Sequence, residues 1–496
     1  MRKSILSKVV LLSTLIFFAM LTNIAFSGTV NLPESGQTKC YDTAGVEIPC
    51  TGTGQDGEIQ AGVAWPDPRF TTNVDTTITD NLTGLVWAPN GNIMPTRDPG
   101  WDTDYTVNDN DGMVTWQHAL DYVAKLNSED YLGHTDWRLP NVNELESLFN
   151  AGEADNAAWI NTQGFANVQA ADYYWSSTTN AGNSGEAWIV YMWNISVGTG
   201  SKSGTDGLYV WSVRSGQCGQ FVDSVICLPQ TGQKVSYAAG DDGDLEQGIA
   251  WPVPRFTDNG NGTVTDNLTC LMWTKDANLP RGYLTWQSAL DYVAGMNAGT
   301  YPNFGYTDWR LPNRKDFFSL IDHSQYNPAL PEGHPFTNVQ DTRYWSSTTY
   351  ASYLGYAWIA PIWYGVVLAD DKSGSSYVWP VRGNKPILNV GIDIKPGSFP
   401  NPINLESKGN VPVAILSSPT FDAATVDRGT VEFAGAPGLP IGGSPEDVNG
   451  DGLIDVVLHF ETQDLDLQPD DTEACLTGKT LSGQEFKGCD SVNIVK

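Results

Sequence analysis

Apolar positions recur at helical spacing in two separate stretches of the chain. Residues three or four positions apart share one face of an α-helix. Such a stripe is formed by Trp116, Leu120 and Val123, and again by Trp286, Leu290 and Val293. Thr115 and Thr285 directly precede the two stripes, and threonine is a favoured N-cap residue. The pattern predicts two equivalent helices that begin after these threonines.

A second pair of helices and a set of strands are predicted downstream of each stripe. Asn141 with Glu144, and Asn313 with Asp316, have the spacing of a capping box. Aromatic or β-branched residues then alternate with small polar ones, which is typical of antiparallel strands. These segments are 173–179, 187–193 and 208–213, with equivalents in the second stretch. Helices followed by a separate group of strands indicate an α+β fold class.

The two stretches belong to a duplicated unit. Ala64-Trp65-Pro66 recurs as Ala250-Trp251-Pro252, and Thr115-Trp116-Gln117 recurs as Thr285-Trp286-Gln287. The two motifs are farther apart in the first copy than in the second. The first copy therefore carries an insertion between them, which includes the acidic stretch 102–111. We interpret this stretch as a solvated loop, with cation binding as the alternative. Motifs that recur in the same order predict two copies of one module.

Two longer motifs are also repeated. Thr-Asp-Trp-Arg-Leu-Pro-Asn occupies 135–141 and 307–313, and Tyr-Trp-Ser-Ser-Thr-Thr occupies 174–179 and 344–349. With these motifs and a closing Val-Trp-x-Val-Arg, residues 65–216 and 251–383 resemble the Lcl C-terminal-domain family. That family is a domain of unknown function named after the terminal domain of a collagen-like bacterial adhesin. The resemblance implies a C-type-lectin-like fold and extracellular ligand binding rather than catalysis.

After the second copy the repeated motifs end and the pattern of apolar positions changes. Apolar segments such as 411–416 and 456–460 stand between Pro and Gly turns, which predicts a small C-terminal β-sandwich. The expected fold is therefore two C-type-lectin-like modules in tandem plus this sandwich. The expected divisions are a signal peptide at 1–27, an N-terminal segment with a disulfide loop at 28–62, a first module at 63–216, a linker with a disulfide loop at 217–248, a second module at 249–383 and the sandwich at 388–496.

One loop of the C-terminal domain has the oxygen spacing of a calcium site. Its positions 1, 3, 5, 7 and 9 are Asp447, Asn449, Asp451, Leu453 and Asp455, with Leu453 offering its carbonyl. The carboxylate that an EF-hand carries at position 12 is missing, because Leu458 stands there. We predict a structural calcium ion in this loop, and an ion-free turn is the alternative.

The seven cysteines fit an exported protein. Three pairs are close in sequence and are expected to form disulfides: Cys40 with Cys50, Cys218 with Cys227, and Cys475 with Cys489. Cys270 is left over, and we interpret it as a buried small apolar residue, with a reactive thiol as the alternative. The basic residues at 2–8, the apolar run 9–24 and the small residues Ala25 and Ser27 predict an export signal cleaved after Ser27.

Charge excludes some partners. The net charge is −30, and loss of three basic residues with the signal would leave 24 − 57 = −33. Such a field repels nucleic acid and anionic lipid. No later apolar stretch is long enough to span a bilayer, so no membrane insertion is expected. Leu228-Pro229-Gln230-Thr231-Gly232 matches a sortase recognition pattern, but we interpret it as chance because it lies mid-chain without an apolar tail.

The segments that differ most between the copies are the expected binding face. They are 180–185 and 191–202 in the first copy and 350–356 and 362–372 in the second. The candidate ligand-binding residues in them are Tyr191, Trp193, Asn194, Tyr353, Tyr356, Trp363, Tyr364 and Asp370. Tryptophans shared by both copies are expected in the core: Trp137, Trp175, Trp188, Trp211, Trp309, Trp345, Trp358 and Trp379.

Sequence motifs for catalysis are missing. The chain has no Gly-x-Ser-x-Gly or His-Glu-x-x-His motif, and its five histidines lack metal-ligand spacing. The leading hypothesis is a secreted or surface-associated non-catalytic protein that binds an extracellular glycan or protein. A structural scaffold of the cell surface is the second hypothesis. An enzyme of the formylglycine-generating type is the third, and it would require Cys270 to lie accessible in a cleft.

Overall fold

The computed structural model describes residues 30–102, 110–204, 207–214, 226–383, 388–418, 421–438, 444–480 and 485–495. The predicted signal peptide, Cys218 and most of the acidic insertion lie outside the described residues. Helices are few and short, strands are numerous, and the fold class is α+β, as predicted. Within the described residues no helix is long and apolar enough to cross a membrane.

The first copy forms module 1, which combines helices with two antiparallel sheets. The sheet orders are β11-β5-β4-β3 and β6-β10-β7-β8-β9, in which only β10 and β7 run parallel. The elements are β3 (Phe70–Thr72), β4 (Ile78–Asp80), β5 (Val86–Trp87), α2 (Met94–Arg97), β6 (Met113–Val114), α3 (Trp116–Ser128), η1 (Tyr131–Gly133), α4 (Val142–Ser147), α5 (Asn156–Thr162), β7 (Tyr173–Thr179), β8 (Glu186–Tyr191), β9 (Ser196–Ser201), β10 (Leu208–Tyr209) and β11 (Val213–Arg214).

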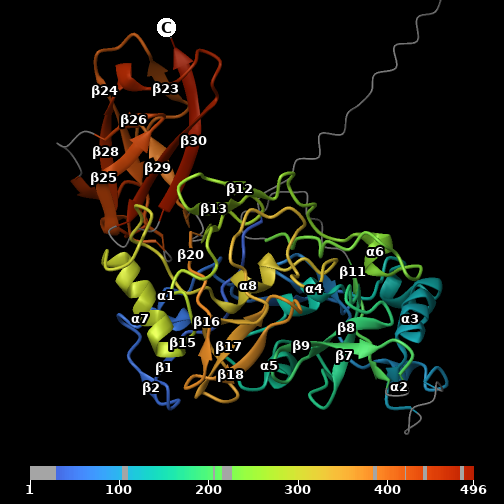
Figure 1. The fold of residues 1–496 in the computed structure, drawn as a ribbon. Helices are drawn as coiled ribbons and strands as arrows, with labels where there is room; N and C mark the ends of the chain where they lie inside the picture. The colour runs from blue at the N-terminus through green and yellow to red at the C-terminus, as the bar shows by residue number, and fades with distance from the viewer. Residues whose placement is uncertain are drawn as a thin grey trace, which may run out of the picture.

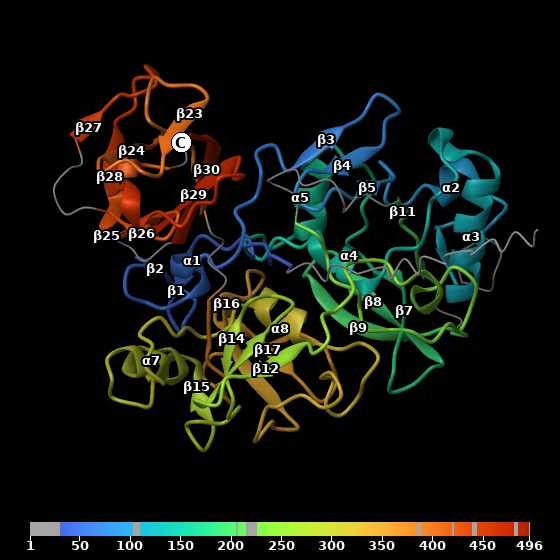
Figure 2. The ribbon, with the colours of Figure 1, turned by 90° about the horizontal axis from the view of Figure 1, so that it is seen from above.

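The second copy forms module 2, whose described elements follow a similar order without counterparts of α2 and α5. Its sheets are β12-β13-β14-β20, β15-β19 and β16-β17-β18. The elements are β12 (Phe256–Asp258), β13 (Thr263–Asp266), β14 (Met272–Thr274), β15 (Leu284–Thr285), α7 (Trp286–Asn297), α8 (Arg314–Leu320), β16 (Arg343–Thr349), β17 (Tyr356–Pro361), β18 (Leu368–Asp371), β19 (Ser375–Ser376) and β20 (Val381–Arg382). Figure 2 shows the two modules side by side, with module 2 in yellow-green to orange.

Helix starts and tryptophans behave as the sequence predicts. Thr115 and Thr285 cap α3 and α7, and both predicted capping boxes are present at α4 and α8. The eight shared tryptophans are all buried, with at most 2% of their surface exposed. Trp116 and Trp286 also donate their indole N–H to the backbone oxygens of Ser176 and Ser346, at 2.9 and 2.8 Å. These bonds fix α3 to β7 and α7 to β16.

The N-terminal segment packs on module 2 as well as on the module that follows it, where the oxygen of Ser35 accepts the backbone N–H of Ala151 at 2.8 Å. It holds β1 (Cys40–Tyr41), β2 (Glu47–Ile48) and α1 (Asp56–Ile59), which lie beside β16 and α7 (Figure 1). The Thr348 hydroxyl donates to Asp56 at 2.6 Å. The Gln37 side chain accepts from the backbone N–H of Thr349 at 2.8 Å and donates to its oxygen at 2.9 Å.

The segment between the modules packs on module 1 through the same contacts. It contains α6 (Asp242–Leu245), and Asp242 accepts from the Thr178 hydroxyl at 2.8 Å. The Gln233 side chain accepts from the backbone N–H of Thr179 at 3.2 Å and donates to its oxygen at 2.6 Å. Each module is thus completed by the segment that precedes the other one. Residues 28–62 and 217–248 contain parts of the two folded units, not only a leader and a linker.

These contacts show that the repeat starts earlier than the first conserved tryptophan. Leu228-Pro229-Gln230-Thr231-Gly232 corresponds to Leu32-Pro33-Glu34-Ser35-Gly36. Thr231 donates its hydroxyl to Asp242 at 2.6 Å, as Ser35 does to Asp56 at 2.6 Å. The sortase-like motif is therefore one copy of a structural element that holds the exchanged segments in place.

A buried charge cluster joins the modules and makes them unequal. Glu146 of α4 is paired with Arg314 and Lys315 of α8, with Lys315 Nζ 3.0 Å from its carboxylate. All three side chains are buried. Arg314 also donates to the backbone oxygen of Ile195 at 2.8 Å. At the equivalent positions module 1 has Val142 and Asn143 instead of the two cations, and module 2 has Phe318 instead of the carboxylate.

The C-terminal domain consists of two sheets that face each other across one core. Their orders are β21-β30-β29-β25-β26, with β23 also paired to β30, and β22-β24-β28-β27. The elements are β21 (Leu388–Asn389), β22 (Ile392–Ile394), β23 (Asn401–Asn404), β24 (Asn410–Ile415), η2 (Ala423–Thr425), β25 (Val426–Phe433), β26 (Ala436–Pro437), β27 (Ser444–Glu446), β28 (Asp455–Glu461), η3 (Thr462–Asp464), β29 (Glu473–Thr480) and β30 (Glu485–Val495).

The cysteines partly follow the prediction. Disulfides join Cys40 to Cys50 and Cys475 to Cys489, whereas the third predicted pair lies partly outside the described residues because of Cys218. The prediction for Cys270 was wrong, because this residue is free and exposed. It sits in a turn with φ of 59°, where module 1 has Gly84 with φ of 70°. Turn geometry, not residue type, places its side chain at the surface.

We predict that Glu146→Gln lowers the free energy of unfolding by about 3–5 kcal/mol, because two buried cations lose the carboxylate that they share. Chemical denaturation measures this change. Replacing the whole cluster by the residues of the equivalent positions (Glu146→Phe, Arg314→Val, Lys315→Asn) should restore much of the loss. Arg281→Gln, which breaks an ion pair at the surface, is the control. A Glu146→Gln protein as stable as this control would show that the cluster does not join the modules.

We also predict that Asp242 makes stability fall as the pH rises from about 4 to about 7. Burial raises the pKa of Asp242 to about 7, although hydrogen bonds from Thr231 and Thr178 lower it. The folded state therefore keeps a proton that the unfolded state releases near pH 4, and stabilisation is lost as pH rises through 7. The difference between wild type and Asp242→Asn should change with pH by at most about 1.4 kcal/mol per unit. A pH-independent difference would contradict the prediction.

Candidate functional site

A cleft between the two modules lies at several of the predicted binding residues. Its volume is about 420 Å³. Module 1 contributes residues around the start of β9, and module 2 contributes the β16–β17 hairpin and strands β17 and β18. The lining residues are Asn194, Ser196, Tyr350, Tyr353, Tyr356, Trp358, Leu368 and Ala369. The cleft exists only because the modules are held against each other.

Aromatic rings in mutual contact form one wall of the cleft. Trp358 is only 1% exposed, and its ring meets that of Tyr350 edge to face with centroids 5.0 Å apart. The ring of Tyr353 follows at 5.8 Å from Tyr350, and that of Tyr356 at 6.1 Å from Tyr353. Tyr353 and Tyr356 are 59% and 38% exposed. The wall therefore runs from a buried indole to two rings that face solvent.

The hairpin backbone sets the positions of these tyrosines. The N–H of Tyr353 donates to the oxygen of Tyr350 at 3.0 Å, and that of Tyr356 donates to the oxygen of Tyr353 at 2.8 Å. The N–H of Tyr350 donates back to the oxygen of Tyr356 at 3.0 Å. A closed hydrogen-bonded turn carries all three tyrosines, so their backbone positions are set without a ligand.

The opposite side of the cleft is small and polar. The Ser196 hydroxyl donates to Asn194 Oδ1 at 2.7 Å, which fixes the amide. Its Nδ2 has no hydrogen bond to another described residue and can donate to a ligand. None of the residues that line the cleft is charged. Aromatic faces opposite amide and hydroxyl groups suit a neutral, hydroxylated ligand better than an ion.

Three of the eight predicted binding residues meet in this cleft: Asn194, Tyr353 and Tyr356. Tyr191 and Trp193 contact each other next to it, with ring centroids 5.9 Å apart. Burial raises the pKa of Tyr191, and the nearby charge of Asp155 contributes. Asp370 instead pairs with Arg343 at 2.7 Å.

Trp363 and Tyr364 are not part of the cleft lining. Their rings contact each other, with centroids 5.1 Å apart, and both contact Tyr326. In the alignment of the two modules, Trp363 and Tyr364 occupy the positions of Trp193 and Asn194 of module 1. The predicted set therefore divides between two related places.

Five lining residues are absent from the predicted set. Tyr350, Ser196, Leu368 and Ala369 lie inside the variable segments, but nothing in their pattern distinguishes them from their neighbours. Trp358 is predicted to belong to the core because it recurs in both copies. That prediction is correct for most of its surface, and the remaining edge forms the floor of the cleft.

The predicted calcium loop lies between β27 and β28. Asp447 accepts backbone N–H groups of Gly450, Asp451 and Gly452 at 2.8–3.1 Å, which closes the loop. Both carboxylate oxygens of Asp455 accept backbone N–H groups, from Ser417 at 2.7 Å and Val448 at 2.9 Å. Leu453 donates its N–H to Asp451 at 2.8 Å, and Asn449 donates to Asp451 at 3.0 Å. The calcium ion stays a prediction.

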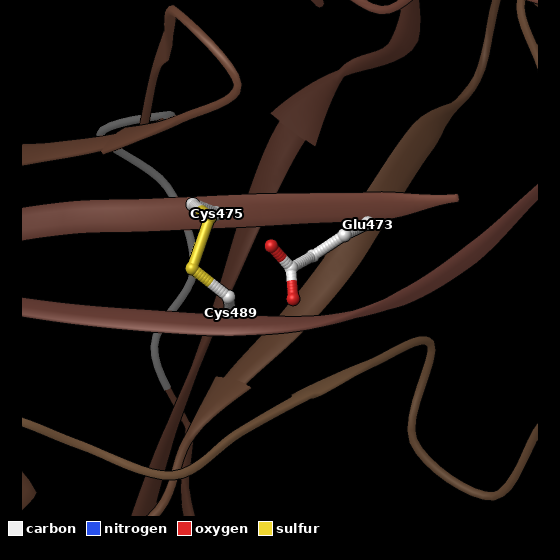
Figure 3. Close-up of side chains that lie close together, drawn as sticks. All are labelled: Glu473, Cys475 and Cys489. Atoms are coloured by element: carbon white, nitrogen blue, oxygen red, sulfur yellow. A yellow bond between two sulfur atoms is a disulfide. The ribbon is translucent and has the colours of Figure 1, made fainter. Parts of the chain in front are cut away.

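One other group of potential metal ligands occurs in the described part of the chain. Glu473, Cys475 and Cys489 lie together on β29 and β30 (Figure 3). The two cysteines are directly opposite in the strand register and form a disulfide. Metal ions bind thiolates, and neither sulfur is available as one here. The disulfide in this group joins β29 to β30, and the group gives no reason to expect a metal.

Fold and cleft together define the class of the protein: a duplicated α+β scaffold in which two modules exchange their leading segments and enclose one cleft. The chain belongs to the Lcl C-terminal domain family, whose model matches residues 76–214 and 262–382. These matches cover more than half of the chain. No curated protein and no solved structure matches it.

Calcium binding is tested by titrating CaCl2 into the chelator-treated protein in a calorimeter. We predict a saturable signal and a higher melting temperature of the C-terminal domain, because an ion that binds only the folded state stabilises it. The double variant Asp447→Asn plus Asp451→Asn should lose both effects. Asp471→Asn, which changes a half-buried turn carboxylate outside the loop, is the control. A wild-type protein without any calcium signal would identify the loop as an ion-free turn.

Proposed function

We propose that the chain is a non-catalytic binding protein that holds a neutral glycan in the cleft between its modules. The observation that carries the proposal is the continuous wall of Trp358, Tyr350, Tyr353 and Tyr356 opposite polar Asn194 and Ser196. The apolar face of a sugar ring packs on aromatic rings, while its hydroxyl groups bond to amides and hydroxyls. The lining offers both kinds of contact.

We also propose that each module has a C-type-lectin-like fold. The order of α3 and α4 in module 1, and of α7 and α8 in module 2, each followed by an antiparallel sheet, supports this assignment. The sugar site would nevertheless differ from that of calcium-dependent lectins. The Glu-Pro-Asn triplet of those lectins is missing from the sequence, and no carboxylate lines the cleft. Sugar binding at this site is therefore expected to be independent of calcium.

Export to the cell surface or medium is also part of the proposal. The basic and apolar N-terminal pattern supports it, as do the two described disulfides, because disulfides persist in oxidising compartments. A protein ligand in place of a glycan is the nearest alternative. A structural scaffold is less well supported, because a scaffold has no need for exposed tyrosines beside a cleft of this size.

An enzyme of the formylglycine-generating type is disfavoured by the position of Cys270. This thiol is at the surface and is not part of the cleft lining. Partial desolvation and the charge of Asp266 raise its pKa, so the reactive thiolate is less populated than in an ordinary cysteine. Cys270 has no partner cysteine near it in the sequence.

A screen of neutral and charged oligosaccharides on an array, followed by calorimetry, tests the proposal. We predict binding of a neutral oligosaccharide that chelator does not change. Tyr353→Ala plus Tyr356→Ala should weaken it at least tenfold, or about 1.4 kcal/mol, because two stacking rings are lost. Tyr283→Ala removes an equally exposed tyrosine of module 2 outside the cleft and should have no effect. Absence of binding to any glycan would move the assignment to a protein ligand or a scaffold.

A further inference from the structure

The cleft beside Trp358 of module 2 has a counterpart beside Trp188 of module 1. We call the first the open place and the second the closed place, and the module around each is its half of the molecule. The strand register that aligns Trp345 with Trp175 also aligns Trp358 with Trp188 and Ala369 with Thr199. The same register aligns Tyr364, which reaches the closed place from module 2, with Asn194, which reaches the open cleft from module 1. The two places therefore differ by the side chain that enters from the opposite module.

The phenol ring of Tyr364 fills the closed place. Its ring centroid lies 6.2 Å from that of Trp188 in an edge-to-face arrangement. Its hydroxyl forms a hydrogen bond with Thr199 Oγ1 at 3.0 Å. These contacts satisfy both the apolar ring and the polar end of the tyrosine.

A second ring seals the closed place from outside. Tyr326 packs edge to face on Tyr364 at 6.2 Å and leaves no room for a side chain at Gly182. In the open half the residue equivalent to Tyr326 is Asp155. The correspondence follows from the next residues, since Asn327 donates to the oxygen of Trp363 at 3.0 Å and Asn156 donates to that of Trp193 at 2.9 Å. Tyr364 and Tyr326 thus correspond to Asn194 and to the carboxylate of Asp155 in the open half, where Tyr350 packs on Trp358 instead.

We propose that the open cleft is a socket for one six-membered ring, which takes the place that Tyr364 fills in the closed half, against Trp358. The identity of this ring as a pyranose rests on the proposed function. The socket itself rests on the internal occupant, which shows the size and the planar shape that the shared scaffold accepts. A pair of modules then carries one open site, and duplication does not provide two sites for avidity.

The chemistry around the socket indicates how a ligand ring would be held. Ala369 replaces Thr199, so the hydroxyl partner of the internal ring is missing in the open half. Polar groups of the ligand must instead meet Asn194 and Ser196 on one side. Tyr350, Tyr353 and Tyr356 replace Asn180, Asn183 and Glu186, which extends the apolar wall outward for further rings of the same ligand.

The test uses p-cresol, the side-chain analogue of the internal occupant, with indole N–H signals of 15N-labelled tryptophan as reporters. Trp358 reports the open place and Trp188 the closed one. In the wild-type chain we expect p-cresol to shift the Trp358 signal and to leave that of Trp188 unchanged. Asn194→Tyr gives the open place the ring that Tyr364 supplies to the closed place, and it should weaken the Trp358 response at least tenfold.

The reciprocal variant Tyr364→Asn should create the second site. It installs the residue that the open half already tolerates, and it leaves the Thr199 hydroxyl in place to bond to the phenol. Trp188 should then respond to p-cresol in addition to Trp358. The signals of Trp116 and Trp286, which are fixed by hydrogen bonds elsewhere in each module, show whether the variants keep their fold.

A wild-type Trp188 response, no Trp358 response, or a Trp358 response that survives Asn194→Tyr in the folded protein would overturn the socket. These results do not depend on any glycan. If p-cresol binds as expected and no glycan does, the socket stands and the proposed function fails. If a glycan binds and Asn194→Tyr leaves its affinity unchanged, the glycan lies elsewhere and the socket is not its site.

Discussion

The structure depends on a single buried carboxylate that serves two buried cations across the interface between the modules. Glu146 contacts Arg314 and Lys315 where the two related helices α4 and α8 meet. Breaking such a cluster is strongly destabilising, because the charge that remains has neither water nor a partner. At the equivalent positions the chain has Phe318, Val142 and Asn143, so the charge cluster occurs on one side of the pair and not on the other. The two copies are therefore unequal where they meet.

The inequality at the interface extends to the cleft. Both halves share the scaffold of a buried tryptophan, a hairpin and a strand, yet one half receives Tyr364 and the other Asn194. The exchanged leading segments hold this arrangement from outside through Asp56 and Asp242, which bond to threonines of the module they cover. The leading segments are repeats of each other in the sequence, and in the structure each one packs on the module that the other precedes. One of the two equivalent places is left open as a result.

Local features of the fold were predictable, and long-range ones were not. Helix starts follow from caps such as Thr115 and Asn141, because these signals act within a few residues, and the buried tryptophans follow from their recurrence in both copies. The exchange of leading segments joins Gln37 to Thr349, and no local pattern reports a contact over such a separation. Cys270 was misassigned because residue type was weighed and the left-handed turn was not. In the cleft, Asn194 and Tyr353 come from different modules, so each could be proposed from its own segment but their pairing could not.

The central claim is that one ring of a neutral glycan enters the cleft between the modules and rests against Trp358. A crystal structure of the chain with the best oligosaccharide from an array tests this claim most directly. The account predicts one oligosaccharide per chain, with its innermost ring between Trp358 and Asn194 and the following rings along Tyr353 and Tyr356. An oligosaccharide seated at any other surface, or two of them bound in equivalent places on both modules, would contradict it.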